Sequence, residues 1–454
     1  MSVGATPSLN FIGDTVEDGA PHSMSEMRGI RFASGNSPTA GPIRLSDFRN
    51  KTITPLFDEA KILASDKQAN DWFGTAVAIS GDGNTLIVGA QYESGTGSAY
   101  IFTRSGTNWN EQQKIQASDR QGNDLFGNSV AISENGNTAI VGAFAEDTGG
   151  SMAGAAYIFT RSGTTWTQQK KIQASNKGFE DQFGWSVAIS GDGNTAIVGA
   201  QYEDTGATDA GAAYIFRRSG TNWNEQQKIQ ASDKGQNDNF GRSVAISENG
   251  NTAIVGAWFA DVVVGANILF NTGAAYIFTR SGTSWSEQQK IQASDKQGGD
   301  RFGTAVAISG DGNTLIVGAG DENRNGAAYI FTRSGNNWSQ QAKIQASDRG
   351  FDDLFGNSVA ISENGNTAIV AAYIEDTGGS DAGAVYMFTR SGTTWSQQAK
   401  IQASDKQAFD NFGKSVAISY DGSTSIVGAM MEDAGVSNTG GAGAAYIYRR
   451  AYYI

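Results

Sequence analysis

The chain contains no cysteine, one histidine and five prolines, and the first two shortages exclude several kinds of site. Without cysteine there are no disulfides, no thiolate-bound zinc and no cysteine nucleophile. Because His22 is the only histidine, no Ser-His-Asp triad can form in the rest of the chain, and we expect no enzyme activity. No apolar run approaches the roughly 18 residues of a membrane span. The polar segment 1–10 lacks the basic start and apolar stretch of a secretory signal, so we expect none.

Positive charge is also scarce, since 33 Lys and Arg residues face 46 Asp and Glu residues and the formal net charge is −13. Residues 1–55 hold five basic and five acidic side chains, so the remaining 28 basic and 41 acidic ones place the whole excess after residue 55. An acidic surface repels a phosphate backbone. We therefore expect no nucleic-acid partner and a surface that suits cations or a basic partner.

The sequence is rich in glycine and contains a long internal repeat. The dipeptide Phe-Gly recurs at spacings of 53 to 62 residues, beginning at Phe73, Phe126, Phe183, Phe240, Phe302, Phe355 and Phe412. In the first unit, three apolar segments (73–80, 85–90 and 98–103) and a more polar one (109–117) are separated by turns or loops. Each unit therefore predicts a four-stranded antiparallel sheet. Because one such sheet cannot bury both faces, the repeat predicts an all-β, seven-bladed β-propeller.

The two ends of the repeat region complement each other. A tryptophan begins the fourth strand after each of the first six Phe-Gly units, but the sequence ends after the third strand of the seventh. Segment 56–65 (LFDEAKILAS) aligns with 109–118 (WNEQQKIQAS), which places Lys61 on Lys114. We therefore expect an N-terminal strand to close the ring, with a small non-repeat arm at 1–55 and the propeller at 56–454. The tryptophans repeat in register, which predicts packing between blades.

The repeat units resemble those of a known family. Each unit carries Phe-Gly, Val-Ala-Ile-Ser, Ile-Val-Gly-Ala and Gly-Ala-Ala-Tyr-Ile-Phe in this order, with small variations. This pattern is similar to the FG-GAP repeat family, which includes the propeller of integrin α chains and many bacterial surface proteins. The bacterial type is the closer match, because Lys-Ile-Gln-Ala-Ser-Asp and Phe-Thr-Arg-Ser-Gly also agree. The resemblance implies a propeller that recognises or attaches to a partner.

Integrin-like repeats often carry a calcium loop, Asp-x-Asp-x-Asp-Gly, between the first two strands. Here that turn reads Gly-Asp-Gly-Asn-Thr (81–85) or Glu-Asn-Gly-Asn-Thr (134–138). These turns are too short and have too few carboxylates to surround calcium, so we expect no metal and no cofactor at them.

A second acidic pattern precedes each Phe-Gly, and Asp66 and Asp71 show it in the first unit. We interpret these aspartates as acceptors for backbone N–H groups. The alternative is a calcium or other cation site shared with the Glu-Asp pairs of the loops between the second and third strands. Those pairs are Glu146–Asp147, Glu203–Asp204, Glu375–Asp376 and Glu432–Asp433.

The loops between second and third strands share one end of the blades with the connections between blades, where propellers commonly bind partners. Segment 258–272 is the longest and is strongly apolar, which predicts a partner contact; the alternative is a plug that folds back. Its candidate contact residues are Trp258, Phe259, Val262, Val263, Val264, Ile268, Leu269 and Phe270. The residue after Phe-Gly varies near the mouth of the central channel. There we predict that Trp185, Arg242 and Lys414 contact a sugar or peptide, or else that they fill the channel.

Residues 1–55 contain two similar pieces, 23–32 (SMSEMRGIRF) and 44–53 (RLSDFRNKTI), which we expect to form short helical turns capped by serine. They resemble Ser-Met-Ser-Glu-Phe-Arg-Gly and Ser-Leu-Ser-Asp-Phe segments in structural proteins of tailed phages. This resemblance implies a virion anchor, and the alternative is a polar arm without a specific role. The candidate anchor residues are Met24, Met27, Arg28, Leu45, Phe48 and Arg49.

These features favour a structural and recognition protein of a tailed-phage virion, in its tail, baseplate or fibre. In this hypothesis the arm binds other virion proteins or further copies of the chain. The propeller loops then contact a host-surface receptor, a glycan or a neighbouring subunit. The second hypothesis is a bacterial surface or secreted adhesin. The third is a propeller that binds glycans or acts as an enzyme.

Overall fold

The computed structural model describes residues 30–31, 54–435 and 440–453. The chain divides into two compact units, 60–447 and a smaller one formed by 1–59 with 448–454, and each is described by itself. The candidate anchor residues, from Met24 to Arg49, lie outside the described residues, and the predicted boundary at residue 55 stays a prediction. Within the described part, no helix is long and apolar enough to cross a membrane.

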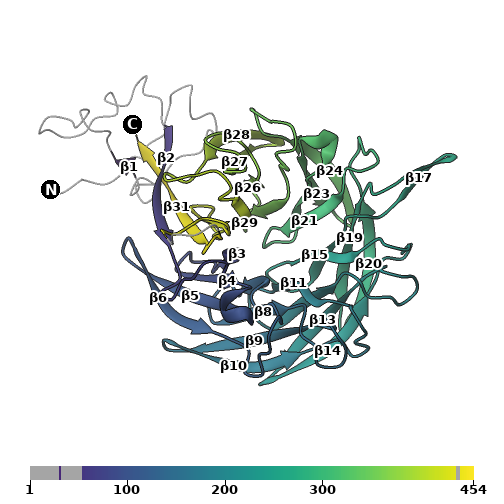
Figure 1. Cartoon of the computed structure of the whole chain (residues 1–454). Helices are drawn as coiled ribbons and strands as arrows, with labels where there is room; N and C mark the ends of the chain where they lie inside the picture. Colours follow the sequence, from purple (N-terminus) through teal and green to yellow (C-terminus); the bar gives the residue numbers. More distant parts are fainter. Residues whose placement is uncertain (1–29, 32–53, 436–439, 454) are drawn as a thin grey trace, which may run out of the picture. The chain divides into compact units, whose positions relative to one another are not determined.

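The large unit is a seven-bladed β-propeller of four-stranded antiparallel blades, as the repeat predicts, and Figure 1 shows the blades around a common axis. Blade 1 consists of β3 (Phe73–Ile79), β4 (Thr85–Ala90), β5 (Ser98–Ser105) and β6 (Asn108–Ile115). Blade 2 consists of β7 (Ser129–Ile132), β8 (Thr138–Ala143), β9 (Ala155–Ser162) and β10 (Thr165–Ile172). Blade 3 consists of β11 (Phe183–Ile189), β12 (Thr195–Ala200), β13 (Ala212–Ser219) and β14 (Asn222–Ile229).

The remaining blades repeat this order from the axis outward. Blade 4 consists of β15 (Phe240–Ile246), β16 (Thr252–Ala257), β19 (Ala274–Ser281) and β20 (Ser284–Ile291). Blade 5 consists of β21 (Phe302–Ile308), β22 (Thr314–Ala319), β23 (Ala327–Ser334) and β24 (Asn337–Ile344). Blade 6 consists of β25 (Ser358–Ile361), β26 (Thr367–Ala372), β27 (Ala384–Ser391) and β28 (Thr394–Ile401). Blade 7 consists of β29 (Phe412–Ile418), β30 (Thr424–Ala429), β31 (Ala444–Tyr453) and β2 (Thr54–Ile62).

Five short elements complete the described structure. A separate hairpin is formed by β17 (Val262–Val264) and β18 (Asn267–Leu269), and two 3-10 turns are η3 (Glu93–Gly95) and η4 (Glu322–Arg324). Strand β1 (Ile30–Arg31) pairs in parallel with the end of β31. The helical turn expected over 23–32 is therefore wrong at Ile30–Arg31. An unpaired strand edge offers hydrogen bonds that a short helical turn cannot match.

The N-terminal strand closes the ring, as predicted. β2 pairs with β31, the third strand of blade 7. Lys61 of β2 bonds Asp405 at 2.7 Å and Glu432 at 2.6 Å, both of blade 7. Lys114, the residue aligned with Lys61 in the sequence, bonds Asp66 and Glu93 in the same way in blade 1.

The ring is closed a second time by the turns between first and second strands. These turns lie at one end of the propeller axis. One residue of each turn donates its backbone N–H to the carbonyl of the equivalent residue in the next blade, at 2.9 to 3.2 Å. The bond from Tyr420 to Gly81 joins blade 7 to blade 1. The participating residues are Gly81, Glu134, Gly191, Glu248, Gly310, Glu363 and Tyr420. The propeller is therefore closed by a backbone ring as well as by β2.

The phenylalanine of Phe-Gly joins its own blade to the preceding one. In blade 2, Phe126 is fully buried and makes edge-to-face contacts with Tyr157 and Phe159, at ring-centroid distances of 5.5 and 6.0 Å. Its backbone N–H donates to the carbonyl oxygen of Thr96 in blade 1 at 3.2 Å. The side chain therefore anchors the core of one blade, while its backbone fixes the blade before it.

The glycine of Phe-Gly allows two backbones to meet. Gly127 has a φ of 96°, a left-handed conformation that strains other residues. It faces Gly89 of β4, and a Cβ atom on Gly89 would lie 1.9 Å from the carbonyl oxygen of Gly127. The same glycine–glycine approach occurs at six of the seven blade junctions. At the junction of blades 6 and 7, Ala371 of β26 replaces the first glycine.

The repeated tryptophans pack between blades, as predicted. Trp166, Trp223, Trp285 and Trp338 are buried in the hydrophobic clusters at the junctions with the preceding blade. Their indole N–H groups donate to a glutamine of the preceding blade at 2.9 to 3.3 Å. The outer strands are therefore joined by a polar bond as well as by apolar area.

We predict that Gly199→Ala destabilises the propeller, because its new Cβ would lie 2.1 Å from the carbonyl oxygen of Gly241, which cannot move away. The cost should be roughly 1–3 kcal/mol, the range for overpacked interiors. The matched control is Ala371→Gly, which removes a methyl group that its junction already accommodates. A thermal melt of both variants tests this. A melting temperature of Gly199→Ala equal to that of the parent chain would show that the junction is loose.

Candidate functional site: the loop face and the propeller axis

We call one end of the propeller the loop face. It consists of the loops after the second strands (91–97, 144–154, 201–211, 258–273, 320–326, 373–383, 430–435 and 440–443) and of the connections between blades. Loops and connections are bonded to each other, since Asn123 in the connection to blade 2 donates its N–H to the carbonyl of Gly95 at 2.7 Å. The sequence-predicted contact residues of segment 258–272 and of the channel mouth all belong to this end.

The second aspartate before each Phe-Gly accepts a backbone N–H from three residues earlier, at 2.5 to 2.6 Å, as predicted. These aspartates are Asp71, Asp124, Asp181, Asp238, Asp300, Asp353 and Asp410. Burial raises their pKa, to about 6 for Asp181, Asp300 and Asp410, although the N–H bond opposes the shift. Their role is therefore to hold the connection as it enters the next blade.

The first aspartate binds a lysine of the blade that follows it. In blade 2, Lys171 Nζ lies 2.7 Å from Asp119 Oδ2 and 2.7 Å from Glu146 Oε1, and 5.6 Å from the ring centroid of Tyr157. The Tyr157 hydroxyl donates to Asp119 Oδ1 at 2.9 Å. Burial alone would raise the pKa of Asp119, but the bonds from Lys171 and Tyr157 hold it below its usual value. A lysine thus occupies the position between the Asp and Glu side chains.

Five blades share this arrangement of one lysine between two carboxylates, and two blades have half of it. In blade 3, Asn176 replaces the aspartate, and Lys228 bonds Glu203 alone. In blade 4, Ala260 stands in place of the glutamate, and Lys290 bonds Asp233 alone. Calcium at these loops stays a prediction. In the part of the chain that the structure describes, no group of three or more His, Cys, Asp or Glu side chains is arranged to hold a metal ion.

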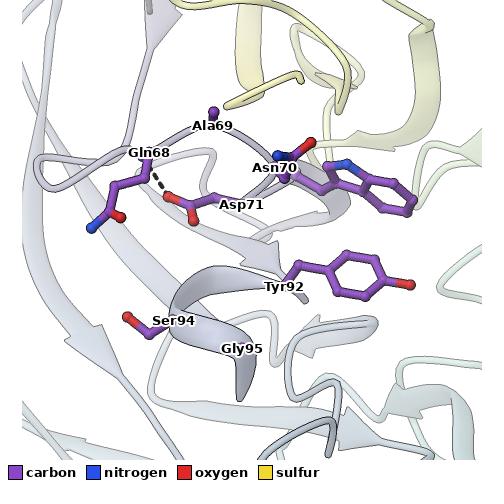
Figure 2. A pocket seen from close by; sticks show the side chains of 8 residues that line it. Gln68, Ala69, Asn70, Asp71, Tyr92, Ser94 and Gly95 are labelled. Atoms are coloured by element: carbon purple, nitrogen blue, oxygen red, sulfur yellow. Dashed lines mark hydrogen bonds between the residues drawn. The ribbon is translucent and has the colours of Figure 1, made fainter. Parts of the chain in front are cut away.

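A pocket of about 490 Å³ lies on the loop face beside blade 1. Its lining residues come from the connection into the blade (68–72) and from the loop after β4 (92–95). Figure 2 shows the carboxylate of Asp71 turned toward Gln68, whose N–H it accepts, with Tyr92 on the other side. The carboxylate of Asp71 is therefore already hydrogen-bonded. The lining also includes Trp72 and Tyr92, whose rings make an edge-to-face contact with centroids 4.5 Å apart.

The structure brings the three predicted channel-mouth residues together at the propeller axis. The Arg242 guanidinium lies over the indoles of Trp185 and Trp258, 4.8 and 4.4 Å from the ring centroids. Lys414 Nζ lies 4.7 Å from the ring centroid of Tyr373. We call these five side chains the axial cluster. They come from blades 3, 4, 6 and 7, so residues far apart in sequence share one site.

The sequence did not assign two members of the axial cluster. Tyr373 was not named at all, and Trp258 was placed with the partner-contact loop rather than at the axis. Both follow the end of a second strand by one residue, a position also held by Phe144, whose ring lies 4.8 Å from that of Trp185. An aromatic residue repeated at this position was the available signal.

Segment 258–272 divides into an inner and an outer part. Trp258 and Phe259 stack on each other at 4.2 Å and are half-buried. Beyond them, β17 and β18 form the hairpin that reaches outward from blade 4 in Figure 1. Val263 and Phe270 are 72% and 63% exposed, and Val264 and Ile268 are also exposed. The tip of the hairpin therefore does not fold back as a plug, and its partner contact stays a prediction.

Three carboxylates meet at the other end of the axis. Glu134, Glu248 and Glu363 begin the turns of blades 2, 4 and 6, whereas blades 1, 3 and 5 have glycine at the same position. The glycines make room, since a Cβ atom on Gly310 would lie 1.3 Å from Glu363 Oε2 and 3.1 Å from Glu248 Oε2. Burial and the charges of Glu248, Glu134 and Asp311 raise the pKa of Glu363 to about 7.

The proton on Glu363 makes stability depend on pH. Its pKa is about 7 in the folded chain against 4.5 when unperturbed, so its contribution is fully present below pH 4.5 and is lost as pH rises through 7. Glu363→Gln should therefore raise the melting temperature at pH 8 and change it little at pH 5. The control is Glu180→Gln on an exposed loop, which removes the same charge. Parallel pH curves for parent and Glu363→Gln would contradict the prediction.

Comparison with protein families agrees with this geometry. The FG-GAP repeat matches seven segments, and each runs from the fourth strand of one blade to the third strand of the next, as the closure by β2 requires. The segments are 56–102, 109–159, 166–216, 223–278, 285–331, 338–388 and 395–448. No curated protein matches the chain. Because the matches span most of the sequence, the chain belongs to the FG-GAP repeat family.

Proposed function

We propose that this chain is a recognition protein that binds its partner through the loop face, as a component of a tailed-phage virion. The observation that carries the recognition role is the distribution of exposed apolar side chains. Of the nine large ones in the described residues, only Tyr420 lies at the turn end. The other eight lie on the loop face: Tyr92, Phe179, Val263, Val264, Ile268, Phe270, Phe351 and Phe409. Exposed apolar groups gathered on one face favour a contact surface.

The loop face also has the rigidity that recognition needs. Each connection is fixed by an aspartate to its own backbone, and in six blades its first aspartate or its Asn176 is bonded to a loop glutamate directly or through a lysine. Such a surface loses little conformational entropy when a partner binds. The exposed phenylalanines Phe179, Phe351 and Phe409 sit on these fixed connections in blades 3, 6 and 7.

The virion location rests on the sequence of residues 1–55, which resembles segments of tailed-phage structural proteins. In this proposal the arm attaches the chain to other virion proteins, or to further copies of itself, in the tail, baseplate or fibre. The loop face then contacts the host surface or a neighbouring subunit. The runner-up is a bacterial surface or secreted adhesin, which the bacterial type of the repeat favours and which would use the same face.

Mass spectrometry of purified phage particles and of the host cell surface separates the two. The proposal expects the chain in the particles at a fixed ratio to known structural proteins. Its presence on the cell surface of uninfected bacteria, and its absence from particles, would establish the adhesin instead. A version lacking residues 1–53 should keep its melting temperature and be lost from particles if the arm is the anchor.

The hairpin supplies a direct test of the loop face. The triple variant Val263→Thr, Ile268→Ser, Phe270→Ser should lose partner binding, in a pull-down from host envelope or virion fractions, because it removes exposed apolar area. Its melting temperature should stay unchanged, since these side chains pack against little. Tyr420→Ser at the turn end is the matched control. Equal binding by the triple variant and the parent chain would remove the hairpin from the contact surface.

A further inference from the structure

The axial cluster holds a guanidinium group in a prepared orientation. Arg242 lies over Trp185 and Trp258, and Trp258 is itself fixed by stacking on Phe259 and by its indole N–H, which donates to Asn239 Oδ1 at 3.1 Å. Cation–π contacts engage the flat faces of a guanidinium and leave the N–H donors on its edge available. Among the described residues, none accepts a hydrogen bond from these donors. Arg242 is half-buried, so part of this residue is in contact with solvent.

A second cation without a carboxylate lies nearby. Lys414 contacts the ring of Tyr373, and no Asp or Glu of the described chain lies within ion-pair distance of Lys414 or Arg242. Burial lowers the pKa of Lys414 to about 8, and the positive charge of Arg242 adds to the shift. Burial likewise lowers the pKa of Arg242 to about 10. The third cation of this region, Arg301, is already paired with Asp321 at 3.1 Å.

This pair of cations contrasts with the acidic character of the chain. The chain as a whole carries a formal net charge of −13, and the lysine of the fourth strand in each blade is bonded to at least one carboxylate. At the axis, in contrast, two half-buried cations lie near each other and have no carboxylate partner among the described residues. Enclosing an unpaired cation costs free energy, which a bound anion offsets. The arrangement is therefore complementary to an anion that enters from the loop face.

We infer that the axial cluster binds a single carboxylate carried by an acidic sugar, between the edge of Arg242 and Lys414. A carboxylate matches the planar, two-donor edge of a guanidinium. The ring that carries the carboxylate would lie beyond the cluster, because Arg242 and Phe259 already cover the faces of Trp258. The exposed acidic side chains around the face, such as Asp147, Asp204 and Asp376, disfavour a ligand with many negative charges. This inference rests on the proposed recognition function, because it names a ligand for the same face.

Titration of the full chain with glucuronate, followed by tryptophan fluorescence and calorimetry, tests the site. We expect saturable binding of glucuronate that weakens with added salt, and no comparable signal with glucose. Arg242→Gln should weaken binding by about tenfold or more, the scale of lost charge-assisted hydrogen bonds, and Lys414→Met should also weaken it. Each change removes cation–π contacts but also the cost of an enclosed, unpaired charge, so both variants should melt close to the parent. Arg120→Gln, at an exposed position of the same face, is the matched control.

Three results would overturn the inference. The first is no saturable binding of glucuronate, the second is equal binding of glucose, and the third is an Arg242→Gln variant that binds as the parent chain does. Binding of an N-acetylated amino acid with a free carboxylate, in place of glucuronate, would overturn the assignment to a sugar and favour a peptide carboxylate. The titration is independent of the particle inventory. A chain that binds glucuronate but is absent from phage particles would therefore contradict the virion proposal and leave this site intact.

Discussion

The close approach of two backbones at each blade junction is the constraint on which the rest of the structure depends. It requires a glycine in Phe-Gly, such as Gly127, and a small residue in the second strand of the preceding blade, such as Gly89. With the backbones in contact, Phe126 can bury its ring in one blade while its N–H bonds the blade before it. The angle between neighbouring blades is thereby repeated, and a repeated angle brings the seventh blade back to the first.

Closure follows from this repetition and is secured twice. The turn residues form a continuous backbone ring at one end of the axis, and β2 supplies the outer strand of blade 7. Lys61 shows that the second closure is specific, since it binds Asp405 and Glu432 as the lysines of blades 1, 2, 5 and 6 bind their own carboxylates. The periodic part of the fold was therefore predictable from the sequence, because largely the same residues recur in every repeat and make the same contacts in each blade.

The site was less predictable, because its members break the repeat. The alignment of Lys61 with Lys114 indicated which strand closes the ring, but not that each lysine lies between an aspartate and a glutamate more than 20 residues away. Arg242 and Lys414 were recognised as departures from a variable position, yet Trp258 was assigned to the hairpin. Trp258 lies at the axis because of the direction in which the chain leaves β16. That direction could not be inferred from the spacing of residues in the sequence. The repeat thus predicts the scaffold. Only the structure shows which of the residues that depart from the repeat lie close together.

The residues that depart from the repeat give the two ends of the propeller axis opposite charges. At the loop face, Arg242 and Lys414 lack carboxylate partners among the described residues, whereas at the turn end Glu134, Glu248 and Glu363 crowd together. Each cluster is electrostatically unfavourable, because it brings partly buried side chains of like charge together. Carboxyl groups relieve this at the turn end by keeping a proton, as the raised pKa of Glu363 shows. A guanidinium group keeps its charge even with its pKa lowered to about 10, so at the loop face the anion that we propose would provide the relief.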